Sequence, residues 1–355
     1  MIFEGKSILV TGGTGSMGRT LVHRVLSGEL GTPRKVIVFS RDESKQHDMR
    51  AHYLHRAAMT DEVIFRNFMN VLEFRIGDVR DYDDVCTSVR DADIVINAAA
   101  LKQVPTCEYF PEQAVLTNCM GAQNIARAIR QHGYPVQSVV AISTDKACKP
   151  VNVMGMTKAI QERMFIAANV LNPGTRFVCV RYGNVLASRG SVIPLFLDQI
   201  QNGGPVTLTV PEMTRFLLSL DQAVDTVFAA LREARRGETY VPNAPAATVA
   251  NIASGLIGAR RVATTVIGIR PGEKMHEIMV SDEEANHTVR RGDYYAILPM
   301  LPELQDEAPK EPNALDKEFS SADNVLDPAG TLELLRRHRL LPEDVALAGE
   351  KELLR

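Results

Sequence analysis

The side chains best suited to catalysis fall in two short stretches near the middle of the chain. Thr144, Asp145 and Lys146 are consecutive and place a hydroxyl, an acid and a base directly after an apolar run. Met154 and Lys158 follow, four residues apart, which puts both on one face of a helix. A well-placed acid or base speeds a proton transfer by roughly 10² to 10⁴. The two stretches therefore predict acid-base chemistry, the alternative being that Asp145 and Lys146 form a surface ion pair.

A glycine-rich turn near the N-terminus predicts a nucleotide site. Gly12, Gly15 and Gly18 form a GxxGxxG pattern directly after the apolar run 7–10 and at the start of an amphipathic stretch. Absent side chains let the backbone approach a pyrophosphate, whose charge then lies at a helix N-terminus. Glycines also serve tight turns that bind nothing, but this triplet stands at the first strand-to-helix turn of a repeating pattern. The intervening residues Thr14, Ser16 and Met17 belong to the same predicted cofactor site.

The residues after the second apolar run indicate which dinucleotide binds. Ser40 and Arg41 stand at the end of that run, and Lys45 comes four residues after Arg41. A hydroxyl and two cations suit a 2′-phosphate, which predicts NADP. In the alternative, NAD, Asp42 would bind the ribose and Arg41 would lie in solvent. Further cofactor contacts are expected after the third and fourth runs, from Asp78, Val79, Ala98, Ala99 and Ala100.

Six apolar runs, separated by longer helical patterns, predict the fold. Alternation of strands with helices is typical of an α/β protein with a doubly wound parallel Rossmann sheet. Mostly continuous apolar runs such as 36–39 fit strands that are buried on both faces. Strands are expected at 7–10, 35–39, 72–76, 93–97, 138–142 and 176–180.

The regular alternation ends after Arg181, which predicts a smaller C-terminal substrate lobe. Residues 1–181 are expected to form the Rossmann domain, and 182–300 the lobe, with some segments returning to the first domain. Residues 301–355 begin with prolines among acidic residues, typical of an extended connection, and end in a helical extension from Asp327.

Composition argues against several classes of function. The chain carries 40 Lys and Arg against 43 Asp and Glu, so it lacks the basic field that drives non-specific binding to nucleic acid. No apolar run approaches the ~18 residues that span a bilayer, and the pattern of a signal peptide is absent. Five scattered cysteines and eight histidines show no metal-ligand spacing. We expect a cytoplasmic protein with no metal, no membrane partner and no nucleic-acid partner.

Taken together, the motifs resemble a known family. The hydroxyl of Thr144 and the helix with Lys158 resemble the active site of extended short-chain dehydrogenases/reductases, with Met154 where that superfamily has tyrosine. Further motifs narrow the resemblance to the inverting UDP-N-acetylglucosamine 4,6-dehydratases of polysaccharide biosynthesis, from the first strand to about Tyr295. Methionine in the tyrosine position resembles the capsular subgroup that makes N-acetyl-L-fucosamine precursors. These motifs are TDKA (144–147), ALKQVP (100–105), RYGNV (181–185), SRGSVIP (188–194), MTRF (213–216) and RPGEK (270–274).

The resemblance implies a role for each catalytic candidate. Hydride would leave sugar C4, the C5 proton and C6 hydroxyl would be eliminated, and hydride would return to C6. Asp145 would protonate the departing C6 hydroxyl, and Lys146 would remove the C5 proton as an uncharged amine, a state that burial and neighbouring cations favour. Thr144 would hold the C4 oxygen and Lys158 the nicotinamide ribose.

The resemblance also implies binding residues and partners. Cofactor contacts would extend to Asn118 and Tyr182. UDP-N-acetylglucosamine would be the substrate, and the chain would form a homo-oligomer, commonly a hexamer in such relatives. The implied substrate contacts are Lys102, Asn184, Arg189, Val192, Pro194, Arg215 and Glu273.

Two questions stay open at the level of sequence. Met154 cannot accept a proton, so Lys158, or a water held by Thr144, would have to take the proton of the C4 hydroxyl. The other readings are a nucleotide-sugar 4-epimerase, a 5,6-dehydratase that stops before hydride return, and an NADP-binding sensor without turnover. An epimerase needs no acid-base pair for elimination across C5 and C6, so Asp145 and Lys146 favour the dehydratase.

Overall fold

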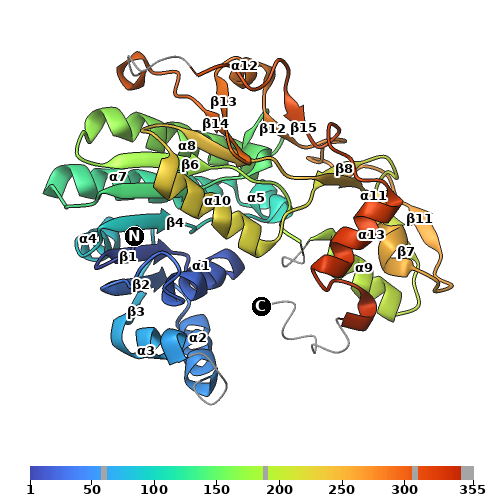
Figure 1. Ribbon diagram of the computed structural model, residues 1–355, viewed down its shortest axis with the longest axis horizontal. Coiled ribbons are helices and arrows are strands. Elements are labelled where there is room, and N and C mark those ends of the chain that lie inside the picture. The colour runs from blue at the N-terminus through green and yellow to red at the C-terminus, as the bar shows by residue number, and fades with distance from the viewer. Residues whose placement is uncertain (57–61, 187–190, 306–310, 345–355) are drawn as a thin grey trace.

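A large, mostly parallel sheet forms the centre of the molecule. The computed structural model describes residues 1–56, 62–186, 191–305 and 311–344. Within these ranges the strand order is β13-β14-β9-β6-β5-β4-β1-β2-β3 (Figure 1). In this sheet order, the neighbouring strands from β9 through to β3 run parallel. The arrangement of β1 to β6 in the sheet confirms the doubly wound Rossmann fold. The parallel strands are β1 (Ser7–Thr11), β2 (Lys35–Ser40), β3 (Leu72–Ile76), β4 (Ile94–Asn97), β5 (Ser138–Ile142), β6 (Arg176–Val180) and β9 (Thr239–Pro242).

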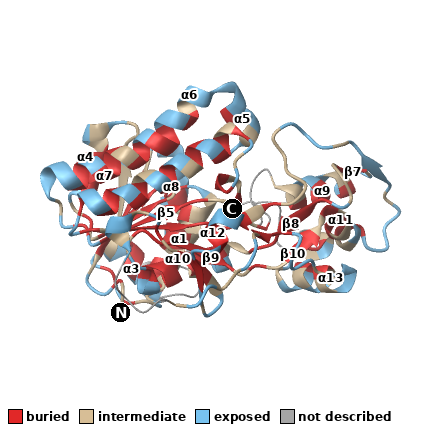
Figure 2. Ribbon diagram, turned by 90° about the horizontal axis from the view of Figure 1, so that it is seen from above, coloured by how far each residue is buried: buried red, intermediate tan, exposed pale blue. Residues whose placement is uncertain are grey.

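Helices cover both faces of this sheet, which explains its apolar strands. Successive side chains of a strand point to opposite faces, so Val36 and Val38 join one apolar cluster while Ile37 and Phe39 join the other. Figure 2 shows the buried residues concentrated on the sheet and on the inner sides of the helices. One face is covered by α1 (Ser16–Leu26), α2 (Glu43–Arg56), α3 (Glu62–Val71) and α10 (Leu220–Glu233), the other by α4 (Tyr82–Val89), α7 (Gly121–His132) and α8 (Val153–Leu171).

A smaller lobe has its own apolar cluster. Phe196, Leu256 and Leu335 belong to this cluster, so the helix expected after Asp327 packs on the lobe. The lobe lies to the right in Figure 1. It comprises α9 (Val192–Gln201), β7 (Val206–Leu208), β8 (Thr214–Phe216), β10 (Ala246–Thr248), α11 (Val249–Ile257), β11 (Thr264–Val266) and α13 (Pro328–Arg337).

The chain crosses between the two bodies more than once. After the first lobe segments it adds α10 and β9 to the Rossmann body, and then the antiparallel strands β14 (Tyr294–Ile297) and β13 (Thr288–Arg291) at the sheet edge. The segment directly before β13 holds β12 (Ile278–Val280) and α12 (Asp282–Ala285). Strand β12 pairs with β15 (Phe319–Ser320). The division at residues 181 and 300 stays a prediction.

Short helices complete the edge of the sheet where the parallel strands end. They are α5 (Val104–Tyr109), α6 (Pro111–Ala114), the π-helix η1 (Val115–Met120) and the 3₁₀-helix η2 (Asp145–Ala147). A further 3₁₀-helix, η3 (Pro302–Leu304), lies at the opposite edge, where Leu304 contacts Gly237 just before β9. Among the described residues, no helix combines the length and apolar character needed to cross a bilayer.

Candidate active site

The glycine turn packs tightly against the neighbouring strand end. Gly12 has φ +65°, and a Cβ there would lie 2.8 Å from the backbone of Ala99, directly after β4. At Gly18 a Cβ would lie 2.5 Å from the Cα of Gly13. Gly15 is the N-cap of α1 and supplies no capping side chain, so the first N–H groups of that helix are left for another acceptor. The turn thus has the backbone-lined helix N-terminus that a pyrophosphate requires.

The predicted 2′-phosphate residues are engaged with carboxylates. Arg41 Nη1 lies 3.5 Å from Asp78 Oδ2, and Lys45 Nζ lies 2.6 Å from Asp42 Oδ2. The hydrogen bond from Lys45 holds the pKa of Asp42 below its usual range. Ser40 accepts a hydrogen bond from the side chain of Gln46. Exposed ion pairs of this kind are worth little, so both cations are available to an incoming phosphate at small cost.

Asp145 and Lys146 lie in η2, just past the carboxyl end of β5. Asp145 has no solvent exposure, and its Oδ1 accepts from the Thr144 hydroxyl at 2.8 Å and from Lys146 Nζ at 3.1 Å. Lys146 also approaches a second carboxylate, Glu277 Oε1, at 3.2 Å. The predicted acid is therefore fully buried and the predicted base largely so, with a side chain 22% exposed, in contrast to a surface ion pair.

The charges around this pair differ from what the sequence predicts. Burial raises the pKa of Asp145, which favours the protonated acid. Burial alone would lower the pKa of Lys146, but the carboxylates of Asp145 and Glu277 outweigh it and raise that pKa above its usual range. The idea that neighbouring cations keep Lys146 uncharged is thus wrong for the described residues, because the two groups that contact its ammonium are carboxylates.

Helix α8 brings Met154 and Lys158 to the same region, as predicted. Met154 is 5% exposed and packs in a small apolar cluster with Cys107 and Ala114. Lys158 Nζ donates to the Ile142 carbonyl oxygen and to Gln161 Oε1 at 2.7 Å. Burial lowers the pKa of Lys158 to about 8. A fraction of this lysine is therefore uncharged at pH values close to neutral.

Two residues of the helical layer fix the position of α8. Gly155 faces η2 so closely that a Cβ would collide with the carbonyl oxygen of Lys146. Asn118, buried in η1, donates to Thr157 Oγ1 and to the Leu101 carbonyl oxygen, each at 3.0 Å. Asn118 thus ties the end of β4 to α8, and a contact with cofactor stays a prediction.

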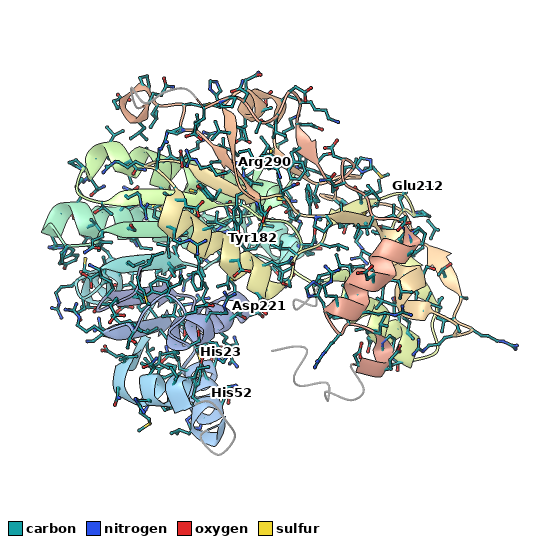
Figure 3. The ribbon with its side chains drawn as sticks, in the orientation of Figure 1. His23, His52, Tyr182, Glu212, Asp221 and Arg290 are labelled. Atoms are coloured by element: carbon teal, nitrogen blue, oxygen red, sulfur yellow. The ribbon has the colours of Figure 1, made fainter. Side chains whose placement is uncertain are left out.

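The predicted substrate residues are spread over the edge between the two bodies. Arg215 is nearly buried, and its Nη1 donates to the carbonyl oxygens of Thr214, Lys274 and Met275. Asn184 Oδ1 and Glu273 Oε2 are buried without a hydrogen-bond partner among the described residues. Lys102 is exposed, Val192 and Pro194 lie half-buried in the first turn of α9, and Tyr182 is buried after β6, where Figure 3 labels it; Arg189 lies outside the described residues.

Comparison with known proteins identifies the family. The model of the family "Polysaccharide biosynthesis protein" matches residues 8–299. The chain belongs to this family. Its fold is that of the extended short-chain dehydrogenases/reductases.

Named relatives of this family carry two kinds of activity. The chain is 41% identical over 345 residues to a "UDP-N-acetylglucosamine 4,6-dehydratase (inverting)" of Campylobacter jejuni, covering 94% of this chain and 97% of that protein. It is 43% identical over 301 residues to a "UDP-glucose 4-epimerase" of Rickettsia typhi, covering 83% of this chain and 84% of that protein. The names alone therefore leave a choice between dehydratase and epimerase.

Solved structures give the same fold. The X-ray structure of Pen from Bacillus thuringiensis superposes with a TM-score of 0.84 at 32% identity, covering 96% of this chain and all of that one. The dTDP-glucose 4,6-dehydratase DesIV of Streptomyces venezuelae, solved with NAD and TYD bound, has a TM-score of 0.62 at 21% identity, over 76% of this chain and 86% of that one. Because of its low identity, the second likeness concerns the fold alone.

Glu277 is a residue of this candidate site that sequence analysis missed. It comes three residues after the RPGEK motif, beside His276, and no local pattern distinguishes it from a surface glutamate. The fold places it 3% exposed against Lys146 and 3.8 Å from Arg215 Nε. It is recognised only from its ion pair with Lys146, which lies 131 positions earlier in the sequence.

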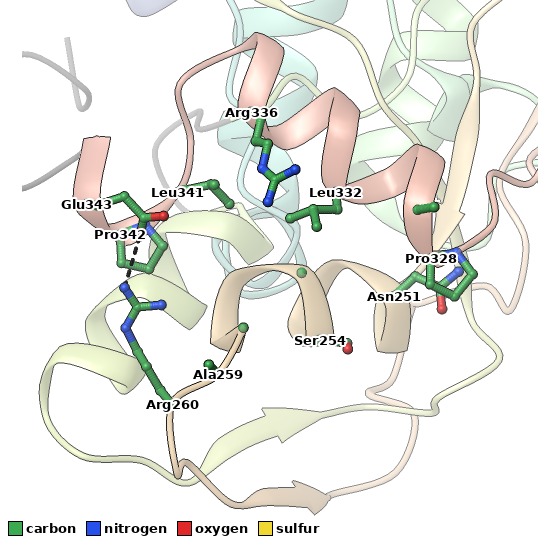
Figure 4. A pocket seen from close by; sticks show the side chains of 13 residues that line it. Asn251, Ser254, Ala259, Arg260, Pro328, Leu332, Arg336, Leu341, Pro342 and Glu343 are labelled. Atoms are coloured by element: carbon green, nitrogen blue, oxygen red, sulfur yellow. Dashed lines mark hydrogen bonds and ion pairs between the residues drawn. The ribbon is translucent and has the colours of Figure 1, made fainter.

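A separate hollow of about 760 Å³ lies between α11 and α13, away from these residues (Figure 4). Asn251, Arg260, Leu332 and Arg336 are among the residues that line it, and Arg260 pairs with Glu343 at 2.9 Å. None of the predicted site residues lines it, so size alone does not locate the chemistry here. No cluster of three His, Cys, Asp or Glu side chains able to hold a metal ion occurs in the described ranges.

Proposed function

We propose that this chain is a nicotinamide-dependent UDP-N-acetylglucosamine 4,6-dehydratase that inverts C5, a hydro-lyase of bacterial surface polysaccharide synthesis. The product would be UDP-2-acetamido-2,6-dideoxy-L-arabino-hex-4-ulose plus water. The observation that carries the proposal is the ion pair of the buried Asp145 with the largely buried Lys146 at the end of β5. Elimination of water across C5 and C6 needs an acid and a base together. The inverting dehydratase of Campylobacter jejuni supports the substrate and the stereochemistry.

The cofactor supplies the redox chemistry, and the chain supplies the protons. When bound, the dinucleotide accepts hydride from C4 and returns it to C6. The open N-terminus of α1 and the side-chain-free approach at Gly12 and Gly15 fit its pyrophosphate. Arg41 and Lys45 favour NADP over NAD, because each is about half exposed and can exchange its carboxylate partner for the 2′-phosphate.

Asp145 is the acid in this proposal. Its raised pKa keeps a proton on a carboxyl group that delivers it to the C6 hydroxyl, which leaves as water. The ammonium of Lys146 first gives its proton to solvent, to which its side chain is partly exposed, and the neutral amine then takes the C5 proton. Thr144 holds the C4 oxygen, and Lys158 binds the nicotinamide ribose.

Methionine at position 154 requires another acceptor for the C4 hydroxyl proton. Met154 is packed among apolar side chains and has no basic atom. Lys158 lies one helical turn further on, and its pKa of about 8 makes the neutral amine accessible. We propose Lys158 as that acceptor, directly or through a water held by Thr144.

The epimerase and the sensor are the competing functions, and one assay separates all three. Purified protein is incubated with UDP-N-acetylglucosamine and added NADP, and the nucleotide sugar is analysed by mass spectrometry. A dehydratase gives a species lighter by one water, and an Asp145→Asn variant forms it far more slowly. An unchanged mass with a new C4 epimer contradicts the proposal in favour of the epimerase, and unchanged substrate with bound NADP contradicts it in favour of the sensor.

We further propose that the chain self-associates through the outer face of η1 and α8. Val115, Leu116 and Met120 of η1 and Met156 and Ile160 of α8 are all more than a third exposed. The two helices adjoin, since Asn118 donates to Thr157. An apolar face of this kind suits a second copy packed about a two-fold axis.

Light scattering tests the assembly. Ile160→Glu should reduce the oligomer, whether dimer or hexamer, whereas Val266→Glu, on exposed β11, should not. A monomeric wild-type protein would contradict the proposal. The five cysteines are buried and unpaired, which supports placing the enzyme in the reducing cytoplasm. Residues 182–300 would form most of its sugar-binding lobe.

A further inference from the structure

Glu277 is built into the site by a segment remote from it in sequence. Its backbone N–H donates to Ser321 Oγ at 2.9 Å, and its carbonyl oxygen accepts from the Ser321 N–H at 2.8 Å. Ser321 Oγ also lies 2.6 Å from Thr214 Oγ1, next to Arg215. The start of β12 is thereby fixed to the end of β15 and to β8. A glutamate held at both backbone groups presents its carboxylate to η2 in a defined position.

Glu277 and Asp145 share one ammonium group. Lys146 Nζ lies 3.1 Å from Asp145 Oδ1 and 3.2 Å from Glu277 Oε1. The other oxygen of each carboxyl group, Asp145 Oδ2 and Glu277 Oε2, is buried and has no hydrogen-bond partner among the described residues. Two carboxylates around one cation, out of water, favour a state in which one of them carries a proton.

The surrounding charges decide which carboxyl group is protonated. Glu277 faces three cations: Lys146 from η2, Arg215 from β8 and Lys274 from its own loop. Lys146 and Arg215 outweigh burial and hold the pKa of Glu277 below its usual range. Asp145 is completely buried and faces Glu277 as a like charge, so its pKa rises. The neighbouring His276 is occupied by Thr214 Oγ1 at 2.7 Å. The proton therefore stays on Asp145 and the negative charge on Glu277.

We propose that Glu277 is the counterion of Lys146 in the dehydration, and that by balancing this charge it lets Asp145 keep the proton that it delivers to the C6 hydroxyl. The inference rests on the proposed dehydratase function. Glu277 acts through Asp145 and Lys146, so it is a positioning residue. The step itself is balanced: the C5–H bond breaks and its proton passes to the neutral Lys146 amine, whose new positive charge Glu277 balances. The C5–C6 double bond forms as the C6–O bond breaks, and the Asp145 O–H bond breaks so that the hydroxyl leaves as water and Asp145 becomes a carboxylate.

Without the charge of Glu277, Asp145 should become the carboxylate that balances the charge of Lys146. In Glu277→Gln the only carboxylate left in contact with Lys146, among the described residues, is Asp145. Lys146 already favours the charged form of Asp145 in the wild type, and the like charge of Glu277 opposes it by raising the pKa of Asp145. Removing that charge should lower the pKa of Asp145, since a neighbouring charge shifts a carboxyl pKa by roughly 1 to 3 units. Asp145 would then lose its proton at lower pH. The acid would be missing at neutral and alkaline pH but present at acid pH.

The test is the pH dependence of kcat for the wild type and three variants with UDP-N-acetylglucosamine. In Glu277→Gln the alkaline limb should move to lower pH by about one unit or more, so activity falls at high pH and approaches the wild type at low pH. Glu277→Asp, which keeps the charge, should keep the wild-type limb. Glu283→Gln, an exposed glutamate in the following helix, is the matched control and should leave the profile unchanged. A loss in Glu277→Gln that is equal at every pH, or a limb that does not move, overturns the inference.

A spectroscopic readout separates this inference from the function on which it rests. Infrared difference spectra during a pH titration should show the carbonyl band of a protonated carboxylic acid in the wild type, absent in Asp145→Asn and titrating at lower pH in Glu277→Gln. Thermal unfolding followed by circular dichroism confirms that the variants are folded. If the wild type shows this band but does not dehydrate the sugar, the proposed function fails while the charge arrangement stands. If Asp145 shows no such band, the inference fails even if the enzyme is active.

Discussion

Replacing Gly155 by alanine should disable the site while leaving the fold intact. Gly155 lies in the first turn of α8, where a Cβ would collide with the carbonyl oxygen of Lys146 and lie 3.0 Å from its carbonyl carbon. Pro150 Cβ would be 3.2 Å away on the same side. Backbone atoms of η2 cannot swing aside as a side-chain end can. The variant therefore has to separate α8 from the segment that carries Asp145 and Lys146.

The structure gives a magnitude for this change. Restoring ordinary contact distances requires a displacement of about 1 Å between η2 and α8, and such a misplacement of reacting groups costs roughly 10² in rate. Overpacking costs about 1 to 3 kcal/mol, but alanine favours a helix interior over glycine by roughly 0.5 to 1 kcal/mol. The free energy of unfolding should thus fall by only about 0 to 2.5 kcal/mol. Activity should suffer far more than stability.

Initial rates and urea unfolding of matched variants measure the two effects. Gly255→Ala is the control: it is also a helical glycine, but its Cβ would meet the flexible Leu335 Cδ1, at 2.9 Å, in the lobe. We expect Gly155→Ala to lose about 10² in kcat and Gly255→Ala to keep the wild-type kcat. Wild-type kcat in Gly155→Ala would refute the claim that close contact of α8 with η2 positions the catalytic pair.

Three further predictions concern the chemistry. If Lys158 accepts the C4 proton, kcat should rise with pH up to about 8, where Lys158 becomes neutral. Met154→Tyr should move this limb of the pH profile. An unchanged profile in Met154→Tyr would mean that position 154 plays no part in proton removal. Arg41→Ala should raise the Kd for NADP in fluorescence titrations by roughly tenfold or more while leaving that for NAD nearly unchanged, and equal losses for both would contradict a 2′-phosphate contact. Asp145→Asn should lower kcat by roughly 10² to 10⁴ with little change in KM, whereas a large KM effect with normal kcat would show that Asp145 binds substrate and is no acid.

Much of the fold follows from local sequence patterns. The six apolar runs predict β1 to β6 to within a residue or two, because strands buried on both faces must be apolar throughout. The glycine turn predicts the start of α1 for an equally local reason. The antiparallel hairpin of β13 and β14 escapes prediction since it joins the sheet through the pairing of β14 with β9, a segment about 50 residues earlier.

The candidate site likewise has a part that the local sequence predicts and a part that depends on distant segments. Asp145, Lys146 and Lys158 can be found from sequence because adjacency and helical spacing place them in relation to one another. The charge state of Lys146 cannot, since it depends on Glu277, which only β12 and β15 bring into contact. Gly155 stands within the sequence motif, yet its significance lies in the carbonyl oxygen it faces. Contacts between elements, therefore, set the electrostatics that the local motif alone does not contain.

Proton NMR of the product formed from UDP-N-acetylglucosamine in D₂O tests the central claim most directly. An inverting 4,6-dehydratase removes the C5 proton and returns one from solvent on the opposite face. The account predicts a 4-keto-6-deoxy sugar with deuterium at C5 and couplings of the L-arabino configuration. A sugar that retains its C5 proton and its C6 hydroxyl, with only C4 inverted, would contradict it and assign the buried Asp145–Lys146 pair to another task.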